Sequence, residues 1–140
     1  MSATRPGGAL VLLVEDDQAG RAMYAFSLEH AGFRVAQAHN GLQALDKAFE
    51  LHPDIIVTDL AIPGIDGLQL SRRLRQDSRT HDIPIIGITG YSGFISEPDR
   101  ALSAGCDAVL LKPCLPEKLQ AEIERLLQTH RSHDAAHPAR

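Results

Sequence analysis

The sequence predicts a doubly wound α/β fold, in which helices cover both faces of a five-stranded parallel sheet. Short apolar runs alternate along the chain with amphipathic stretches of helical period. Strands that alternate with helices form parallel sheets, because a right-handed crossover between them is close to obligatory. The chain has 140 residues, of which 44% are hydrophobic, which is enough for one core. We therefore expect a single folded domain.

Five apolar runs are the expected strands. They are Ala9–Val14, Phe33–Ala36, Ile55–Thr58, Pro84–Ile88 and Ala108–Leu111. The third run is rich in β-branched residues and lies between helix breakers, as is typical of a central strand that is covered on both faces. It is followed directly by Asp59, at the end of the strand where such sheets keep their chemistry.

A helical pattern follows each run, and its apolar stripe should pack on the sheet. The stripes are Ala22, Met23 and Phe26 in the first helix, Leu42, Leu45 and Phe49 in the second, Leu68 and Leu74 in the third, and Leu119, Ile123, Leu126 and Leu127 in the fifth. Asp17 and Asn40 are the expected N-caps of the first two helices, and Gly32 should follow the end of the first. Residues 96–99, Ser-Glu-Pro-Asp, resemble a capping box with proline in the first turn, so the fourth helix should start late and cover about residues 97–104.

Charge and composition limit the classes of function. The formal net charge is −4, from 14 basic and 18 acidic residues, so the chain has no basic footprint and we expect no direct contact with nucleic acid. The chain lacks the apolar segment of a signal peptide and the run of roughly 18 apolar residues that a membrane span needs. These observations predict a cytoplasmic protein without a membrane partner.

The two ends and the cysteines carry little functional information. Residues 1–8 and 128–140 are polar and contain proline, so we expect both segments to be disordered and the domain to cover residues 9–127. Cys106 and Cys114 have neither a C-x-x-C nor a zinc spacing. This predicts buried or incidental thiols without a redox role.

Polar residues that carry chemistry follow four of the five strands. Glu15 and Asp16 come after the first strand, Asp59 after the third, Thr89 after the fourth and Lys112 after the fifth. The carboxyl ends of parallel strands share one edge, so these residues should be neighbours. Three crowded carboxylates repel one another unless a cation lies among them, and an all-oxygen site suits Mg²⁺. With a fixed lysine charge and a hydroxyl donor added, the set fits a phosphoryl group on Asp59.

Some aspartates of the chain fit simpler roles. The chain also lacks the residues that define two other classes of α/β protein. An aspartate beside a strand is often only a helix cap or turn residue, a role that fits Asp54 and Asp66. An aspartyl-nucleophile phosphatase of the haloacid dehalogenase type needs a second acid two residues after the nucleophile, where this chain has Ala61. A dinucleotide-binding module needs G-x-G-x-x-G after the first strand, where this chain has VEDDQAG.

Four motifs together resemble the response-regulator receiver domain of two-component signalling, including the chemotaxis regulators. They are the acidic pair in VLLVEDD, the acceptor and its loop in IIVTDLAIPGIDG, the threonine in GITG and the Lys-Pro pair in AGCDAVLLKP. The resemblance covers roughly Leu10 to Leu127. It implies a flavodoxin-like sheet with the strand order 2-1-3-4-5.

The resemblance also implies a metal site and a phosphoacceptor. Asp59 would be the nucleophile that accepts a phosphoryl group from a phosphohistidine on a histidine kinase or a histidine phosphotransfer protein. Mg²⁺, or Mn²⁺ in its place, would bind Asp16, Asp59 and the carbonyl of Ala61, and Glu15 directly or through water. The domain would be a switch, with at most slow autodephosphorylation, rather than an enzyme.

The remaining implied roles concern the switch. Lys112 would pair with Asp59 and then with a phosphoryl oxygen, Thr89 would bond another oxygen, and the Lys112–Pro113 bond would be cis. A downstream protein would read the face formed by the fourth helix, fifth strand and fifth helix. The chain departs from the family at Val109, where an aromatic residue is usual. The residues that flank the path of a hydrolytic water in this family are here Ala61 and Tyr91. Neither offers a carboxylate or an amide to orient the water, so loss of phosphate should be slow.

The context of the domain has two interpretations. The chain is either a free-standing regulator or the receiver segment of a hybrid sensor histidine kinase or phosphorelay protein, and the sequence names neither the kinase nor the output.

Overall fold

A computed structural model describes residues 8–90 and 96–136 of the protein, with the side chains of residues 8–90 and 99–130. In this part of the chain five strands form one parallel sheet. They are β1 (Leu10–Val14), β2 (Arg34–Ala38), β3 (Ile55–Asp59), β4 (Ile85–Thr89) and β5 (Ala108–Leu111). Their order is β2-β1-β3-β4-β5, which confirms the predicted fold. The observed strands agree with the expected runs, although β2 lies further along the chain than predicted.

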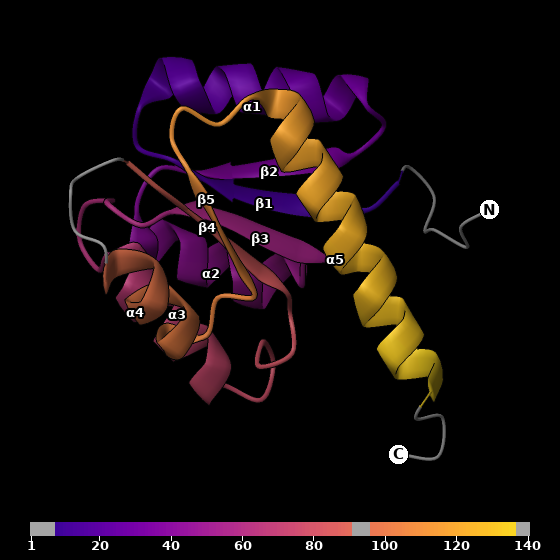
Figure 1. The fold of residues 1–140 in the computed structure, drawn as a ribbon. Helices are drawn as coiled ribbons and strands as arrows, with labels where there is room; N and C mark the ends of the chain where they lie inside the picture. The colour runs from indigo at the N-terminus through magenta and orange to yellow at the C-terminus, as the bar shows by residue number, and fades with distance from the viewer. Residues whose placement is uncertain (1–7, 91–95, 137–140) are drawn as a thin grey trace.

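Helices cover both faces of the sheet (Figure 1). They are α1 (Gln18–His30), α2 (Gly41–Leu51), α3 (Gly67–Gln76), α4 (Ser96–Ala104) and α5 (Pro116–Ala136). Helices α1 and α5 lie on one face, and α2, α3 and α4 lie on the other (Figure 1). The fourth helix is short and starts late, as predicted. The side chains of the expected capping box at residues 96–98 lie outside the described residues.

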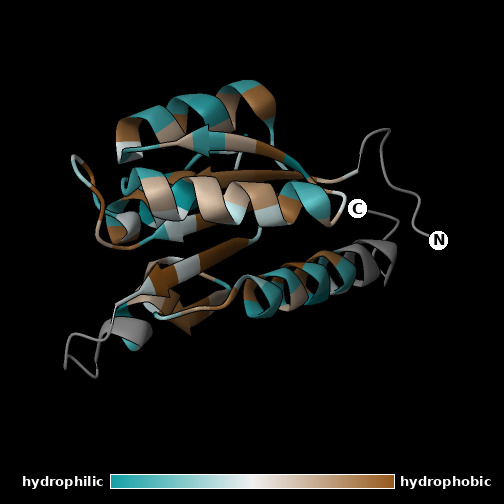
Figure 2. Ribbon diagram, turned by 90° about the horizontal axis from the view of Figure 1, so that it is seen from above, coloured by the Kyte–Doolittle hydropathy of each residue, from teal (hydrophilic) through white to brown (hydrophobic). Residues whose placement is uncertain are grey.

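The strands divide the hydrophobic core into two layers, because successive side chains of a strand point to opposite faces. Val11 and Leu13 pack under α1 and α5, whereas Leu12 and Val14 pack under α2 and α3. Figure 2 shows much of the sheet in brown, whereas the helices carry both brown and teal residues. All five residues of β3 are buried, which agrees with a central strand that is covered on both faces.

Caps fix where three helices begin. The side chain of Asp17 accepts a hydrogen bond from the backbone N–H of Gly20 at 2.8 Å, and that of Asn40 accepts one from Gln43 at 2.8 Å. Asp66 accepts from Gln69 at 2.8 Å and caps α3. Gly32 follows α1 with a φ of +103°, a conformation that favours glycine. These residues have the capping roles predicted for them.

The predicted apolar stripe of α1 is wrong. Met23 is 46% exposed and Phe26 is 73% exposed, while Tyr24, Ala25 and Leu28 face the core. Both sets have helical spacing, so periodicity alone could not choose between them. The predicted stripe of α2 is wrong in part, because Leu42 is exposed and Leu45 is buried. The stripes of α3 and α5 are confirmed, because all their predicted residues are buried except Leu127, which is partly buried against the core.

The carboxyl-terminal helix is longer than predicted. α5 continues to Ala136, so residues 128–136, which we expected to be disordered, are helical. The polar composition of this segment had suggested a tail, but composition alone does not distinguish a tail from a helix. Residues 1–7 and 137–140 lie outside the described residues. None of the described helices is long and apolar enough to cross a membrane, and the cytoplasmic location stays a prediction.

Candidate functional site

The carboxyl edge of the sheet brings the predicted acidic residues together. Glu15, Asp16 and Asp59 each place one carboxylate oxygen here, and these three oxygens all lie within 4.8 Å of one another. Glu15 and Asp59 are 5% and 6% exposed, whereas Asp16 is exposed. Two buried carboxylates and one exposed carboxylate form an acidic pocket that can hold a cation.

Backbone contacts hold Glu15 at the start of this pocket. Its N–H donates to the carbonyl of Ala38 in β2 at 3.0 Å, which extends the strand pairing by one residue. Its side-chain Oε2 accepts from the N–H of Asp17 at 3.0 Å. Arg21 Nη1 donates to the carbonyl of Glu15 at 2.8 Å, and Arg21 Nε donates to Gln37 Oε1 at 3.2 Å. The loop between β1 and α1 is therefore held by hydrogen bonds to β2 and from α1.

The two oxygens of Asp59 have different partners. Oδ1 accepts a hydrogen bond from the backbone N–H of Ala61 at 2.9 Å. Oδ2 lies 2.5 Å from Lys112 Nζ, which is also 3.5 Å from Glu15 Oε1. The backbone N–H of Lys112 donates to the carbonyl of Thr89 at 2.8 Å. One ammonium group thus neutralises part of the charge of two buried carboxylates.

The charges shift two pKa values in this pocket. Burial raises the pKa of Glu15 above its ordinary 4.5, the hydrogen bond from Asp17 opposes the rise, and the charge of Asp59 adds to it. Burial lowers the pKa of Lys112, but the hydrogen bond and charge of Asp59 and the charge of Glu15 outweigh burial, so the pKa lies above 10.5. Lys112 therefore holds a positive charge beside Asp59, and a bound cation would offset the burial that disfavours the ionised form of Glu15.

The other predicted residues lie around this pocket. Thr89 ends β4 and is 4% exposed, and the peptide bond between Lys112 and Pro113 is cis, as predicted. Val109 lies partly buried against the core layer under α2, α3 and α4. Tyr91 lies outside the described residues. The roles of Thr89 toward a phosphoryl group and of the Ala61 carbonyl toward a metal stay predictions.

The loop after Asp59 depends on a glycine. An added Cβ at Gly67 would lie 2.7 Å from Leu60 Cα and 2.8 Å from the carbonyl oxygen of Asp59, so any other residue would displace the backbone of the acceptor. The N–H of Gly67 also donates to the carbonyl of Leu60 at 3.0 Å. The first turn of α3 thus packs directly on the segment that carries the acceptor.

Sequence reasoning missed two residues that contact this site through the backbone. They are Arg21, described above, and Tyr24, whose hydroxyl donates to the carbonyl of Cys114 at 2.7 Å, two residues after Lys112. The residue pattern does not indicate either contact, because every residue has a backbone carbonyl and the sequence does not show which carbonyl a side chain will reach.

The fold and the pocket define a class of protein, and the comparisons agree. The family model of the response regulator receiver domain matches residues 11–124. The chain therefore belongs to the response regulator receiver domain family. Members of this family are signalling switches. The acidic pocket is the place where the family binds Mg²⁺.

Individual relatives cover most of the chain. The DNA-binding dual master transcriptional regulator RpaA of Synechocystis is 37% identical over 118 residues, which are 84% of this chain and 48% of RpaA. The phosphate regulon transcriptional regulatory protein PhoB of Pseudomonas aeruginosa is 35% identical over 131 residues, 94% of this chain and 57% of PhoB. The receiver domain of a signal transduction histidine kinase from Syntrophus aciditrophicus has a solved structure that is 30% identical, with a TM-score of 0.81, and the match covers 87% of this chain and 92% of that one.

These relatives correct one prediction. The chain spans about half the length of the curated relatives it matches. We expected no direct contact with nucleic acid, but RpaA is named a DNA-binding regulator and PhoB a transcriptional regulatory protein, so that expectation is wrong. The expectation rested on the net charge of this chain. That charge says nothing about the parts of the relatives that lie outside the matched region. The comparisons also do not favour the hybrid-kinase alternative, because the curated relatives are response regulators.

Proposed function

We propose that Asp59 accepts a phosphoryl group from a phosphohistidine of a kinase or phosphotransfer protein, in a Mg²⁺-dependent reaction. The observation that carries the proposal is the contact of Lys112 Nζ with Asp59 Oδ2 at 2.5 Å, beside two further carboxylates within 4.8 Å. A carboxylate that is paired with a cation and lies beside the exposed Asp16 is a suitable nucleophile.

The transfer moves one phosphoryl group from nitrogen to oxygen. A carboxylate oxygen of Asp59 attacks phosphorus while the P–N bond to the histidine breaks, and the electron pair of that bond returns to the imidazole ring, which takes up a proton. Glu15, Asp16, Asp59 and the carbonyl of Ala61 would hold the metal, which would neutralise charge on the transferred group. Lys112 holds a second positive charge at the acceptor oxygen throughout. The product is an acyl phosphate on Asp59.

The switch follows from the hydrogen-bond donors that the phosphoryl group attracts. The hydroxyl of Thr89 is at the end of the neighbouring strand and can donate to a phosphoryl oxygen, and Lys112 can follow the same group. Such contacts favour one of two conformations of the segments that follow β4 and β5, and a partner protein that binds one conformation better then senses phosphorylation.

The first prediction tests the acceptor. Incubation with acetyl phosphate and Mg²⁺ should add the mass of one phosphoryl group to the intact protein, and the Asp59→Asn variant or EDTA should abolish the addition. Asp54→Asn is the matched control, because Asp54 precedes the same strand at its opposite end and should be labelled like the parent. Labelling that persists in Asp59→Asn would show that another residue is the acceptor.

The second prediction concerns loss of the phosphoryl group. Neither Ala61 nor Tyr91 offers a carboxylate or an amide that could orient a water, so we propose slow autodephosphorylation. The Tyr91→Glu variant supplies a carboxylate and should lose label several-fold faster than the parent at equal loading and saturating Mg²⁺, followed by intact-protein mass over time. Tyr91→Phe is the control and should decay like the parent. Equal decay of all three proteins would exclude position 91 as a determinant of the lifetime.

A further inference from the structure

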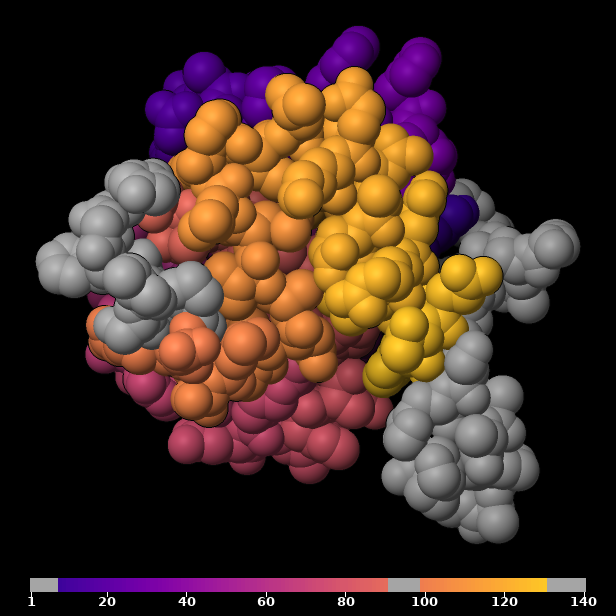
Figure 3. Space-filling view, in the orientation of Figure 1, coloured from indigo at the N-terminus to yellow at the C-terminus, as the bar shows by residue number. Residues whose placement is uncertain are grey.

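The hydroxyl of Tyr24 joins the first helix to the segment that carries Lys112. Tyr24 is in the second turn of α1, is 6% exposed, and its hydroxyl donates to the backbone carbonyl of Cys114 at 2.7 Å, a contact between residues 90 positions apart. Cys114 lies between the end of β5 and the start of α5 and is itself 6% exposed. In Figure 3 this segment, in orange, lies against the indigo and purple atoms of the first helix.

The position of Lys112 depends on how this short segment is held. Before Lys112, β5 pairs with β4, and the N–H of Lys112 donates to the carbonyl of Thr89 at 2.8 Å. After Lys112, the backbone carbonyl of Cys114 accepts the hydrogen bond from the Tyr24 hydroxyl. The lysine side chain is 37% exposed, so packing around its stem constrains it only in part. Asp59 and Glu15 hold its ammonium group, and the backbone on both sides of Lys112 sets the point from which the side chain reaches them.

We propose that Tyr24 is a positioning residue for phosphoryl transfer: its hydroxyl fixes the Cys114 carbonyl, and so holds the Lys112 ammonium group on Asp59. The inference rests on the proposed function of Asp59 and Lys112. Tyr24 touches neither the acceptor nor the phosphoryl group and acts only through the segment that bears Lys112. A displacement of a catalytic group by about 1 Å is enough to slow a positioned reaction severely.

A buried tyrosine could also serve only the stability of the core, and the chain offers a control for that. The hydroxyl of Thr80, which is fully buried, donates to the carbonyl of Leu74 at 2.7 Å, at the end of α3 and far along the chain from Lys112. Tyr24→Phe and Thr80→Val each remove one buried hydroxyl that donates to a backbone carbonyl. Both variants should lower the urea midpoint of unfolding.

The two variants should differ in phosphorylation. At saturating Mg²⁺, Tyr24→Phe should slow labelling by acetyl phosphate about fivefold, because the lysine is less well placed, whereas Thr80→Val should be labelled like the parent. The affinity for Mg²⁺ should be unchanged in both, since the carboxylates are on β1 and β3. Equal rates in the two variants, or a matching loss of Mg²⁺ affinity in Tyr24→Phe, would overturn the inference.

A double-mutant cycle shows whether Tyr24 acts through Lys112. In a Lys112→Ala background, Tyr24→Phe should change the labelling rate no further, whereas a general structural role would give the same fivefold loss in both backgrounds. The NMR signal of the Lys112 Cε group is a readout that does not need labelling. It should move in Tyr24→Phe and stay in place in Thr80→Val, and an unmoved signal would also overturn the inference. Failure of the parent to be labelled would instead refute the proposed function, and the two failures are thus distinguishable.

Discussion

Carboxylates at the two edges of the sheet have different surroundings. At the carboxyl edge, Glu15, Asp16 and Asp59 face one another, and one lysine serves two of them. At the amino edge, Asp54 and Asp107 lie on separate loops, and each accepts a hydrogen bond from the backbone N–H at the start of a neighbouring strand. Asp54 accepts from Leu10 at 2.7 Å, and Asp107 accepts from Ile85 at 2.8 Å.

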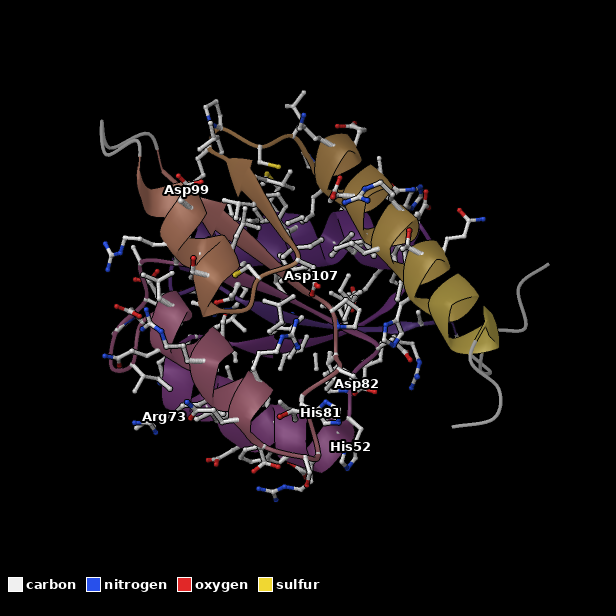
Figure 4. The ribbon with its side chains drawn as sticks, turned by 60° about the horizontal axis from the view of Figure 1, so that its bottom comes forward. His52, Arg73, His81, Asp82, Asp99 and Asp107 are labelled. Carbon is white, nitrogen blue, oxygen red and sulfur yellow. The ribbon has the colours of Figure 1, made fainter. Side chains whose placement is uncertain are left out.

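The amino edge also has a fixed cation. Arg75, at the end of α3, donates to the carbonyls of Gly105, His81 and Ile83 at 3.0, 3.0 and 2.6 Å, and to Asp107 Oδ2 at 2.7 Å. Figure 4 shows this edge, with Asp107 and His81 labelled on loops that precede strands. The arginine thus joins two connecting segments, the one between α3 and β4 and the one between α4 and β5.

The difference follows from the direction of the strands. A parallel sheet presents N–H groups without ladder partners at one edge and carbonyls without ladder partners at the other. Carboxylates at the amino edge bind those N–H groups and stabilise the fold. At the carboxyl edge Glu15 and Asp59 each accept one backbone N–H from the loop after their own strand, and the second oxygen of each faces Lys112. In the function proposed above, this charge also serves a metal and a phosphoryl group. The same residue type is structural at one edge and chemical at the other.

The largest expected effect on stability tests the amino edge. Arg75→Ala removes the donors of three carbonyls and should lower the free energy of unfolding by about 2 to 3 kcal/mol in urea denaturation. The ion pair adds little to this figure, because the Asp107 side chain is 42% exposed. Labelling of Asp59 should be unchanged below the transition, since the two edges share no partner.

Arg73 is the control for that substitution. It is on the same helix, is exposed, and is labelled on the outside of α3 in Figure 4, so Arg73→Ala should change stability by less than about 0.5 kcal/mol. If Arg75→Ala slowed labelling as much as Lys112→Ala did, the two edges would be coupled and the contrast between them would fail.

The next effect tests the carboxyl edge. Mg²⁺ at ten times its Kd should stabilise the fold by about 1.4 kcal/mol, which would raise the melting temperature by about 4 °C. The rise should disappear in Asp16→Asn and persist in Arg75→Ala, measured relative to each variant without metal. A rise of the same size in Asp16→Asn would place the metal elsewhere.

Residues at the strand ends are predictable because topology fixes them. A parallel sheet puts the residues after each strand at one edge, so the sequence alone is enough to bring Glu15, Asp59 and Lys112 together. The buried face of α1 was not predictable, since Met23 and Phe26 have the same spacing as its true core residues. Only contact with α5 and the sheet decides which set is covered.

Side chains that act through backbone carbonyls were not predictable at all. Arg21 and Tyr24 lie within α1, where nothing in the residue pattern marks a partner. Each reaches a carbonyl next to the pocket, on Glu15 and on Cys114. Their partners are set by how α1 packs on the sheet, and that packing is a property of the whole fold.

The smallest expected effect is the pH dependence of Glu15. Its pKa in the folded protein is raised by burial above the 4.5 of the unfolded chain, so the ionised side chain destabilises the fold at any pH above the folded value. As the pH falls through the folded pKa toward 4.5, the folded state takes up the proton first, and this cost disappears. Glu15→Gln should therefore be more stable than the parent at pH 8 without metal, by less than about 1 kcal/mol.

The pH series of that variant decides between charge and packing. The advantage of Glu15→Gln should shrink as the pH falls from 8 toward 4.5, and saturating Mg²⁺ should reverse its sign at pH 8, because the metal favours the carboxylate. Glu29→Gln, the same change at an exposed position of α1, should leave the difference near zero across the series. An advantage of Glu15→Gln that stayed constant from pH 8 to 4.5 would come from packing, and the carboxyl edge would then lack the electrostatic cost that distinguishes it from the amino edge.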